Sequence, residues 1–337
     1  SERYELFSRE YYWSPGHEYF QNEYHGGLEK RDSSVRNKTL LNLEKYDGFQ
    51  FSLDFPALEL VDIKENVLTA QNWNIDNPHQ IITFIAWLCA LAVMLIGLLA
   101  PENKRVLMLL TLSSLCLLVF NSVTMSAWVF KRFKDQQLRF IALLGSGAFM
   151  LCIAGDVVNF NLPQHYYRYS TLIKHDYLVD SILFFAPGYS LLFIACVLAF
   201  NLKRRVSLMK SALFFVVVLV LSSASLSTMY LEGAGDTILA MTGVYSLVIT
   251  AVGLMGLVLV VAYGGINAPK SIVWVSLGLF LAALADAIIG AFWIYGNQGQ
   301  GFYPQVRYIN WFVYISSQSL VIHLAKVVAV IPNRNNA

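Results

Sequence analysis

The sequence predicts an all-α protein, a polytopic transmembrane bundle of eight helices that follows a small polar N-terminal region. Of the 337 residues, 56% are hydrophobic and only 14% are charged, whereas a soluble domain carries about 25% charged residues. Eight stretches are long and apolar enough to cross a bilayer, which takes about 20 residues of helix. Each must be helical because lipid offers no hydrogen-bond partners to an open backbone.

The eight expected spans divide the chain into three parts. We assign residues 1–77 to the polar region, residues 78–332 to the transmembrane domain and residues 333–337 to a short tail. The spans themselves are expected at residues 80–100, 105–129, 139–160, 178–200, 211–231, 238–263, 271–296 and 309–331.

The distribution of basic residues predicts the orientation of the bundle. Ten Lys and Arg residues flank the spans on the side that carries the loops after spans 2 and 4, against five on the opposite side. Because loops rich in Lys and Arg stay in the cytoplasm, we expect both termini to be cytoplasmic. Aromatic residues near the last outer loop, Tyr295, Tyr303, Tyr308 and Trp311, are typical of a membrane interface.

The region before the spans has a different character. It is polar and carries mixed charges, and the segment FQFSLDF at residues 49–55 alternates apolar and polar residues, which is typical of a short strand. Pro56 would end that strand. We therefore expect a small cytoplasmic region. The chain starts at Ser1 and not at Met, which leaves open whether a segment upstream of it was removed.

Several functional classes lack their sequence signals. The net charge of +2 comes without a basic patch interleaved with aromatic residues, so no nucleic-acid partner is expected. The four cysteines lie in four different apolar runs, a spacing that fits neither disulfides nor zinc. The sequence contains no G-x-S-x-G, H-E-x-x-H or phosphate-loop motif. We expect no cofactor and no metal.

Ionisable residues inside the spans are the main candidates for a functional site, because charges in a bilayer are costly. Asp156 lies in span 3 and Asp286 in span 7, and Asp180 lies at the outer edge of span 4. Span 8 contains His323 and Lys326. We expect Lys326 to extend to the headgroups and His323 to be a hydrogen-bonded core residue. A retinal-binding lysine is the alternative for Lys326.

The two central aspartates are expected at matching depth. Asp156 follows Arg139 by 17 residues and Asp286 follows Lys270 by 16, so both lie roughly 25 Å from the inner surface at 1.5 Å per residue. Each also shares a helix face with small residues, which let helices approach closely. We therefore expect the two carboxylates to face one another in a polar pocket, where one acts as an acid and the other as a base.

Five segments of the spans together form a distinctive pattern: NKRVLMLLTL (103–112), AGDVV (154–158), LFFAPGYSLLFIA (183–195), LGLFLAALADAIIG (277–290) and YISSQSLVI (314–322). This pattern resembles a known family, the YhhN/TMEM86-like (lysoplasmalogenase-like) integral membrane proteins. The resemblance covers residues 80–331 as a pattern and includes the number of spans. It does not extend to residues 1–77 or to the long loop at 161–177.

The resemblance implies hydrolysis of the vinyl-ether bond of a lysolipid. Asp156 and Asp286 would be the catalytic pair: one, protonated, would protonate carbon, and the other would stabilise the oxocarbenium-like cation or activate water. Tyr314 and Gln318, one turn apart on span 8, would orient the substrate or its water, and Asp180 is a further candidate for substrate binding. The aromatic residues of the 161–177 loop would cover the site.

Three other functions remain open from the sequence. The bundle could be a receptor or sensor module that binds an apolar ligand without turnover and signals through residues 1–77. It could be a proton-coupled transporter, although no internal repeat is visible and Pro187–Gly188 is the one clear interruption of a span. A retinal protein is the third of these alternatives.

Overall fold

The computed structural model describes residues 78–160, 167–169, 172–174, 178–228, 236–294 and 304–331. The expected N-terminal region with its strand at 49–55, and the tail at 333–337, lie outside these residues. Within them, eight helical segments are long and apolar enough to cross a membrane. The protein is an all-α, multi-pass membrane protein, as the sequence predicts.

The spans begin and end within a few residues of their expected positions. They are formed by α5 (Pro78–Leu99), α6 (Lys104–Arg132), α7 (Gln136–Asn159), α8 (Leu178–Asn201), α9 (Leu208–Thr228), α10 (Asp236–Ala262), α11 (Lys270–Ile288), and α12 (Pro304–Val321) together with α13 (Leu324–Val330).

Two spans depart from a regular α-helix. Span 7 continues beyond α11 as a π-helical stretch, Ile289–Ile294, and span 8 is interrupted between α12 and α13 at Ile322 and His323. A short antiparallel hairpin of β1 (Tyr167–Tyr169) and β2 (Leu172–Lys174) interrupts the loop between α7 and α8. The sequence did not predict this hairpin. We call the end of the bundle that carries it the hairpin end.

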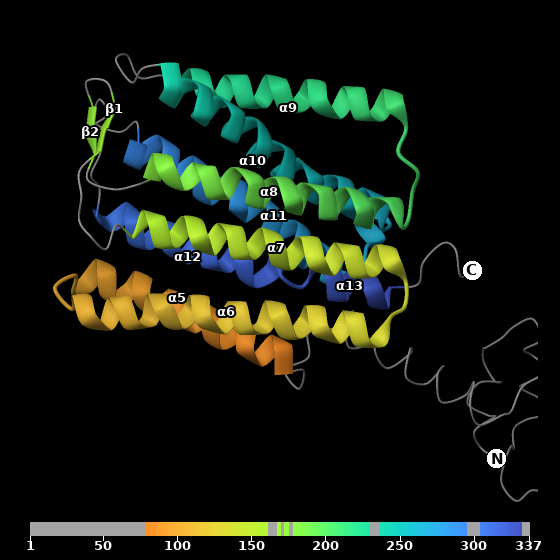
Figure 1. Ribbon diagram of the computed structural model, residues 1–337, viewed down its shortest axis with the longest axis horizontal. Helices are drawn as coiled ribbons and strands as arrows, with labels where there is room; N and C mark the ends of the chain where they lie inside the picture. The colour runs from red at the N-terminus through yellow and green to blue at the C-terminus, as the bar shows by residue number, and fades with distance from the viewer. Residues whose placement is uncertain are drawn as a thin grey trace, which may run out of the picture. The chain divides into compact units, whose positions relative to one another are not determined.

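Seven of the helical spans form a closed ring. Going round the ring, each helix packs against the next in the order α5, α6, α7, α8, α10, α11 and α12, and α12 packs against α5 again. The eighth, α9, lies outside the ring and packs on α10 (Figure 1). Only 11% of the α9 span is buried, against 78% of the span formed by α12 and α13.

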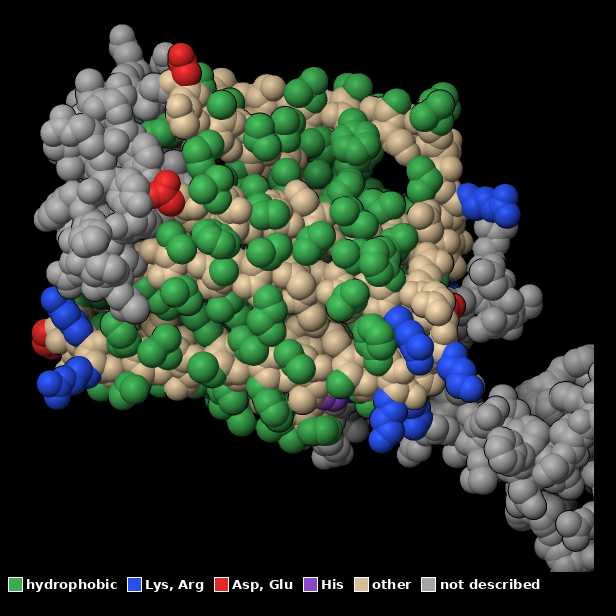
Figure 2. Space-filling view, viewed as in Figure 1, with side chains coloured by type: hydrophobic (Ala, Val, Ile, Leu, Met, Phe, Trp, Pro, Cys, Tyr) green, Lys and Arg blue, Asp and Glu red, His purple; other side chains and the backbone are tan. Residues whose placement is uncertain are grey.

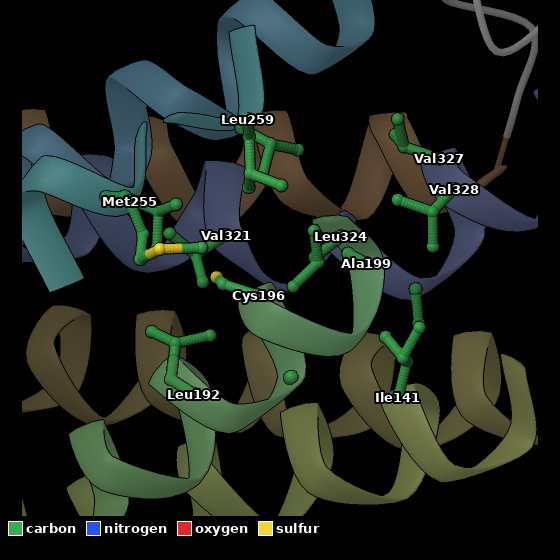
Figure 3. Packing of buried hydrophobic residues seen from close by; sticks show 14 of the residues in the cluster. Ile141, Leu192, Cys196, Ala199, Met255, Leu259, Val321, Leu324, Val327 and Val328 are labelled. Carbon is green, nitrogen blue, oxygen red and sulfur yellow. The ribbon is translucent and has the colours of Figure 1, made fainter. Parts of the chain in front are cut away.

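The interior of the ring is apolar toward the end opposite the hairpin. There Leu192 of α8, Met255 of α10 and Val321 of α12 belong to one buried cluster, in which Leu259 and Val328 also lie (Figure 3). Burial of such side chains contributes about 1.5–3 kcal/mol each in water. Within a membrane, close packing replaces that driving force, so small residues at the helix contacts matter.

Two glycines on the helices that carry the site allow close helix contacts. A Cβ on Gly188 of α8 would lie 3.0 Å from the carbonyl oxygen of Ala148 and 3.0 Å from Sγ of Cys152, both on α7. A Cβ on Gly278 of α11 would lie 2.7 Å from Cβ of Leu320 on α12. The face of α7 with Ala148 and Cys152 and the face of α11 with Gly278 were expected to pack against other helices because of their small residues, and both do.

The outer surface of the bundle matches a lipid environment. Hydrophobic side chains form a band along the helices, and Lys and Arg side chains gather at the two ends (Figure 2). The exposed apolar residues include a long series on α9, among them Leu213, Phe215, Val216, Leu219 and Val220. The helix outside the ring therefore presents most of its surface to lipid.

Candidate functional site

Asp156 is a buried carboxylate in the ring. It lies on α7 near the hairpin end, and only 4% of its surface is exposed. The hydroxyl of Tyr314 on α12 donates a hydrogen bond to Oδ2 of Asp156 over 2.8 Å. The expected helix-interface face of span 3 is also confirmed, because Ala148 and Cys152 on the same face are buried. Two of the predicted site residues, Asp156 and Tyr314, are therefore in direct contact.

Asp286 has an equivalent phenol partner on the other side of the ring. It lies on α11, two residues before the end of that helix, and is half-buried. The hydroxyl of Tyr245 on α10 donates to Oδ2 of Asp286 over 2.9 Å. The π-helical stretch begins three residues later, and π-type turns occur frequently at functional sites.

The two carboxylates are close enough for their charges to interact. Tyr189 of α8 is within electrostatic range of both carboxylates, and only 1% of its surface is exposed. Its oxygen accepts a hydrogen bond of 3.3 Å from Nε2 of Gln318, on the same helix as Tyr314. Five helices of the ring, α7, α8, α10, α11 and α12, thus contribute polar groups to one constellation.

The backbone of α8 explains how Tyr189 reaches this position. Pro187 lies inside α8 and lacks the N–H that would continue the helix hydrogen bonding. Gly188 follows and lets the helix approach α7 where Cys152 lies. Tyr189 is the next residue. The close approach of α7 and α8 at Gly188 therefore lies next to the phenol that neighbours the carboxylates.

Aromatic rings surround the constellation. The ring of Tyr189 lies 6.3 Å from those of Phe185 and Tyr245, measured between centroids. Phe185 also lies 6.3 Å from Tyr314, edge to face. Trp311 lies 5.7 Å from Tyr314. The carboxylates are therefore enclosed by π-systems as well as by hydroxyl groups.

Asp180 is not brought into this network. It lies in the first turn of α8 and is half-buried. Its Oδ2 atom is buried and has no hydrogen-bond partner within the described part of the chain. The expected cover from the aromatic residues of the 161–177 loop concerns side chains outside the described residues.

Sequence reasoning missed Tyr189 and Tyr245. Apolar spans commonly contain tyrosine, so neither residue stands out by type. The signal that could have identified Tyr189 is its position directly after Pro187–Gly188. Nothing in the local sequence distinguishes Tyr245, because its partner Asp286 is 41 residues away.

A second buried polar network lies where span 8 is interrupted. Oγ1 of Thr83 lies 2.8 Å from Nε2 of His323, and Nδ2 of Asn121 donates to Oγ1 of Thr83 over 2.8 Å. His79, in the first turn of α5, bonds Oδ1 of Asn121 over 2.8 Å. His323 is therefore a hydrogen-bonded core residue, as expected.

Leu118, Phe149 and Ile315 belong to an apolar cluster that also includes Tyr314.

Lys326 lies over an aromatic ring. Its Nζ atom is 5.1 Å from the centroid of Trp128 on α6, a distance at which a cation–π interaction is favourable. The expectation that this side chain extends to the headgroups remains a prediction.

Among the described residues, no group of three or more His, Cys, Asp or Glu side chains could hold a metal ion.

Comparison with known protein families, with characterised proteins and with solved structures gives no match for this chain.

Proposed function

We propose that the protein is an integral membrane hydrolase that acts on a lysolipid or vinyl-ether lipid through Asp156 and Asp286. The observation that supports this most directly is the pair of carboxylates, each hydrogen-bonded by one phenol and close enough to interact. Intramembrane carboxylates of this kind usually serve a function. The resemblance of five segments to the YhhN/TMEM86-like family is part of the same proposal.

The proposed reaction needs one protonated and one ionised carboxyl group. The first transfers its proton to the outer carbon of the vinyl ether, which leaves an oxocarbenium-like cation. The ionised group stabilises that cation and then accepts a proton from the water that adds to it. The resulting hemiacetal collapses to an aldehyde and a free alcohol. Tyr314 and Tyr245 hold the two carboxylates in place, and Gln318 holds Tyr189.

Aldehyde release from a vinyl-ether lysolipid tests this proposal with the purified full chain in lipid nanodiscs. We expect Asp156→Asn and Asp286→Asn each to lower turnover about 100-fold or more, the usual contribution of a general acid or base. Asp135→Asn is the matched control, because Asp135 caps α7 at the opposite end of the bundle. Unchanged turnover in both site variants, or no turnover by the unmodified protein, would contradict the proposal.

A receptor without turnover is the second candidate. The observation that favours it is the contact of His79, where the described chain enters the bundle, with the network at the interruption of span 8. Span 8 also carries Tyr314 and Gln318, so a ligand at the carboxylates could act on the region before α5. Ligand-dependent binding of another protein to residues 1–77, without aldehyde release, would favour this function.

The proposed orientation places both termini in the cytoplasm and the carboxylates in the outer half of the membrane. The excess of Lys and Arg at the loops after spans 2 and 4 supports it.

A further inference from the structure

The carboxylate site contains acidic groups without a basic counterpart. The groups that interact electrostatically with Asp156 are Tyr314 and Asp286, and the partner of Asp286 is Tyr245. Among the described residues, neither carboxylate has a Lys, Arg or His partner. An anionic ligand such as a phosphate group would add a further negative charge to an enclosed site, which is unfavourable. A cationic group would be attracted.

The aromatic rings around the carboxylates also favour a cationic ligand over an anionic one. The faces of Tyr, Trp and Phe rings carry partial negative charge and attract ammonium groups within about 6 Å. Tyr189, Tyr245, Phe185 and Tyr314 form a connected series with neighbouring centroids 6.3 Å apart. Ring faces and carboxylates together are how proteins recognise organic cations.

A buried acceptor one turn from Tyr314 lacks a donor. Asn310 lies one turn before Tyr314 on the same face of α12 and is 7% exposed. Its Oδ1 atom has no hydrogen-bond partner among the residues that the structure describes. Buried polar atoms are nearly always paired, so Oδ1 of Asn310 indicates a missing N–H or O–H donor. A primary ammonium group supplies three such donors.

We infer that this site binds the primary ammonium head of a single-chain amphiphile. The cation lies between Asp156 and Asp286 against the aromatic rings, and its tail extends toward lipid on the side of α10 and α11. Asp286 and Tyr245 are half-buried while Asp156 is buried, so the head enters from the side of α10 and α11. The inference deepens the proposed function and rests on the same site, because an ammonium group resembles the cation formed during vinyl-ether hydrolysis.

A series of ligands with one tail and different heads tests the inference on the unmodified protein. The full chain in nanodiscs of zwitterionic lipid is titrated with dodecylamine, dodecyltrimethylammonium, dodecanol and dodecyl sulfate. We expect dodecylamine to bind at least about tenfold more tightly than dodecanol, which corresponds to 1.4 kcal/mol. Dodecyltrimethylammonium should bind less tightly than dodecylamine because it has no N–H donor, and dodecyl sulfate should show no saturable binding. Equal affinities for the amine and the alcohol would overturn the inference.

Variants locate the binding site. Asp156→Asn, Asp286→Asn and Asn310→Leu should each weaken dodecylamine binding by about tenfold or more, with dodecanol binding little changed. Asp135→Asn is the control for the aspartates. Tyr189→Phe should weaken binding, because the substitution removes the hydroxyl bonded by Gln318. Tyr263→Phe, which removes a hydroxyl that donates to the carbonyl of Ala199, should not. Unchanged affinity in both aspartate variants would overturn the inference.

Inhibition separates this inference from the proposed hydrolase. If dodecylamine binds and its binding needs both aspartates, but the protein does not hydrolyse the vinyl ether, the ammonium site is supported and the hydrolase proposal is rejected. If the protein hydrolyses the vinyl ether and dodecylamine does not inhibit the reaction, the hydrolase proposal is supported and the ammonium site is rejected.

Discussion

At the scale of single residues, the two aspartates are distinguished by their partners. Asp156 accepts from Tyr314, and Asp286 accepts from Tyr245. A buried carboxylate that loses its donor keeps the full cost of leaving water. The phenols are therefore as necessary to the site as the acids, whatever ligand it binds.

Removal of one phenol hydroxyl should destabilise the fold measurably. We expect Tyr314→Phe to cost about 1–3 kcal/mol, because it leaves the buried Asp156 oxygen without its donor. Tyr308→Phe on the same helix is the control, because the hydroxyl of Tyr308 forms no hydrogen bond within the described part of the chain. Thermal unfolding in detergent measures both variants. A cost for Tyr314→Phe no larger than that for Tyr308→Phe would show that the contact is unimportant to stability.

The residue scale also shows what sequence could predict about the site. Asp156 and Asp286 stand out because a charged group in an apolar span is energetically costly and usually functional. The small residues on the same helix faces indicated contacts with other helices. Tyr314 was named beforehand as a candidate for orienting the substrate. The pairing of Tyr245 with Asp286 could not be predicted, because it depends on α10 and α11 being neighbours in the ring.

At the scale of elements, interruptions of regular helix lie close to the polar groups. The π-helical stretch follows Asp286, and span 8 breaks at His323. α8 stays helical through Pro187 and Gly188, which directly precede Tyr189. Irregular turns of the π type frequently lie at functional sites.

The contact between α7 and α8 should be sensitive to one added methyl group. We expect Gly188→Ala to destabilise the protein by about 1–3 kcal/mol, because overpacking forces the helices apart. A Cβ on Gly145 of α7 would have no heavy atom within 4 Å. Gly145→Ala should therefore be neutral or stabilising by up to about 1 kcal/mol, through helix propensity.

Thermal unfolding of both glycine variants in the same detergent gives the comparison. Similar melting temperatures for Gly188→Ala and the unmodified protein would mean that the close approach of α7 and α8 is not needed.

At the scale of the whole molecule, a closed ring of seven spans encloses an interior with two parts. The part toward the hairpin end holds the carboxylates. The opposite part holds apolar side chains such as Leu192 and Met255 together with the polar network of Thr83 and His323. α9 lies outside this ring.

The orientation of the ring can be tested with single cysteines in a variant that lacks the four native ones. We expect an impermeant maleimide to label Glu102→Cys in intact cells and Arg204→Cys only after the membrane is opened, because basic loops remain cytoplasmic. These positions lie at opposite ends of the bundle. The reverse pattern would contradict the proposed orientation.

The sequence by itself determined that the chain is an eight-span helical membrane protein, and it identified the two aspartates within it. Both conclusions follow from local properties, because the length of an apolar run and the cost of a buried charge do not depend on which helices are neighbours. Only the tertiary structure decided that the ring excludes α9 and that Tyr245 and Tyr189 join the acids. Those contacts join residues far apart in sequence, so packing alone selects them.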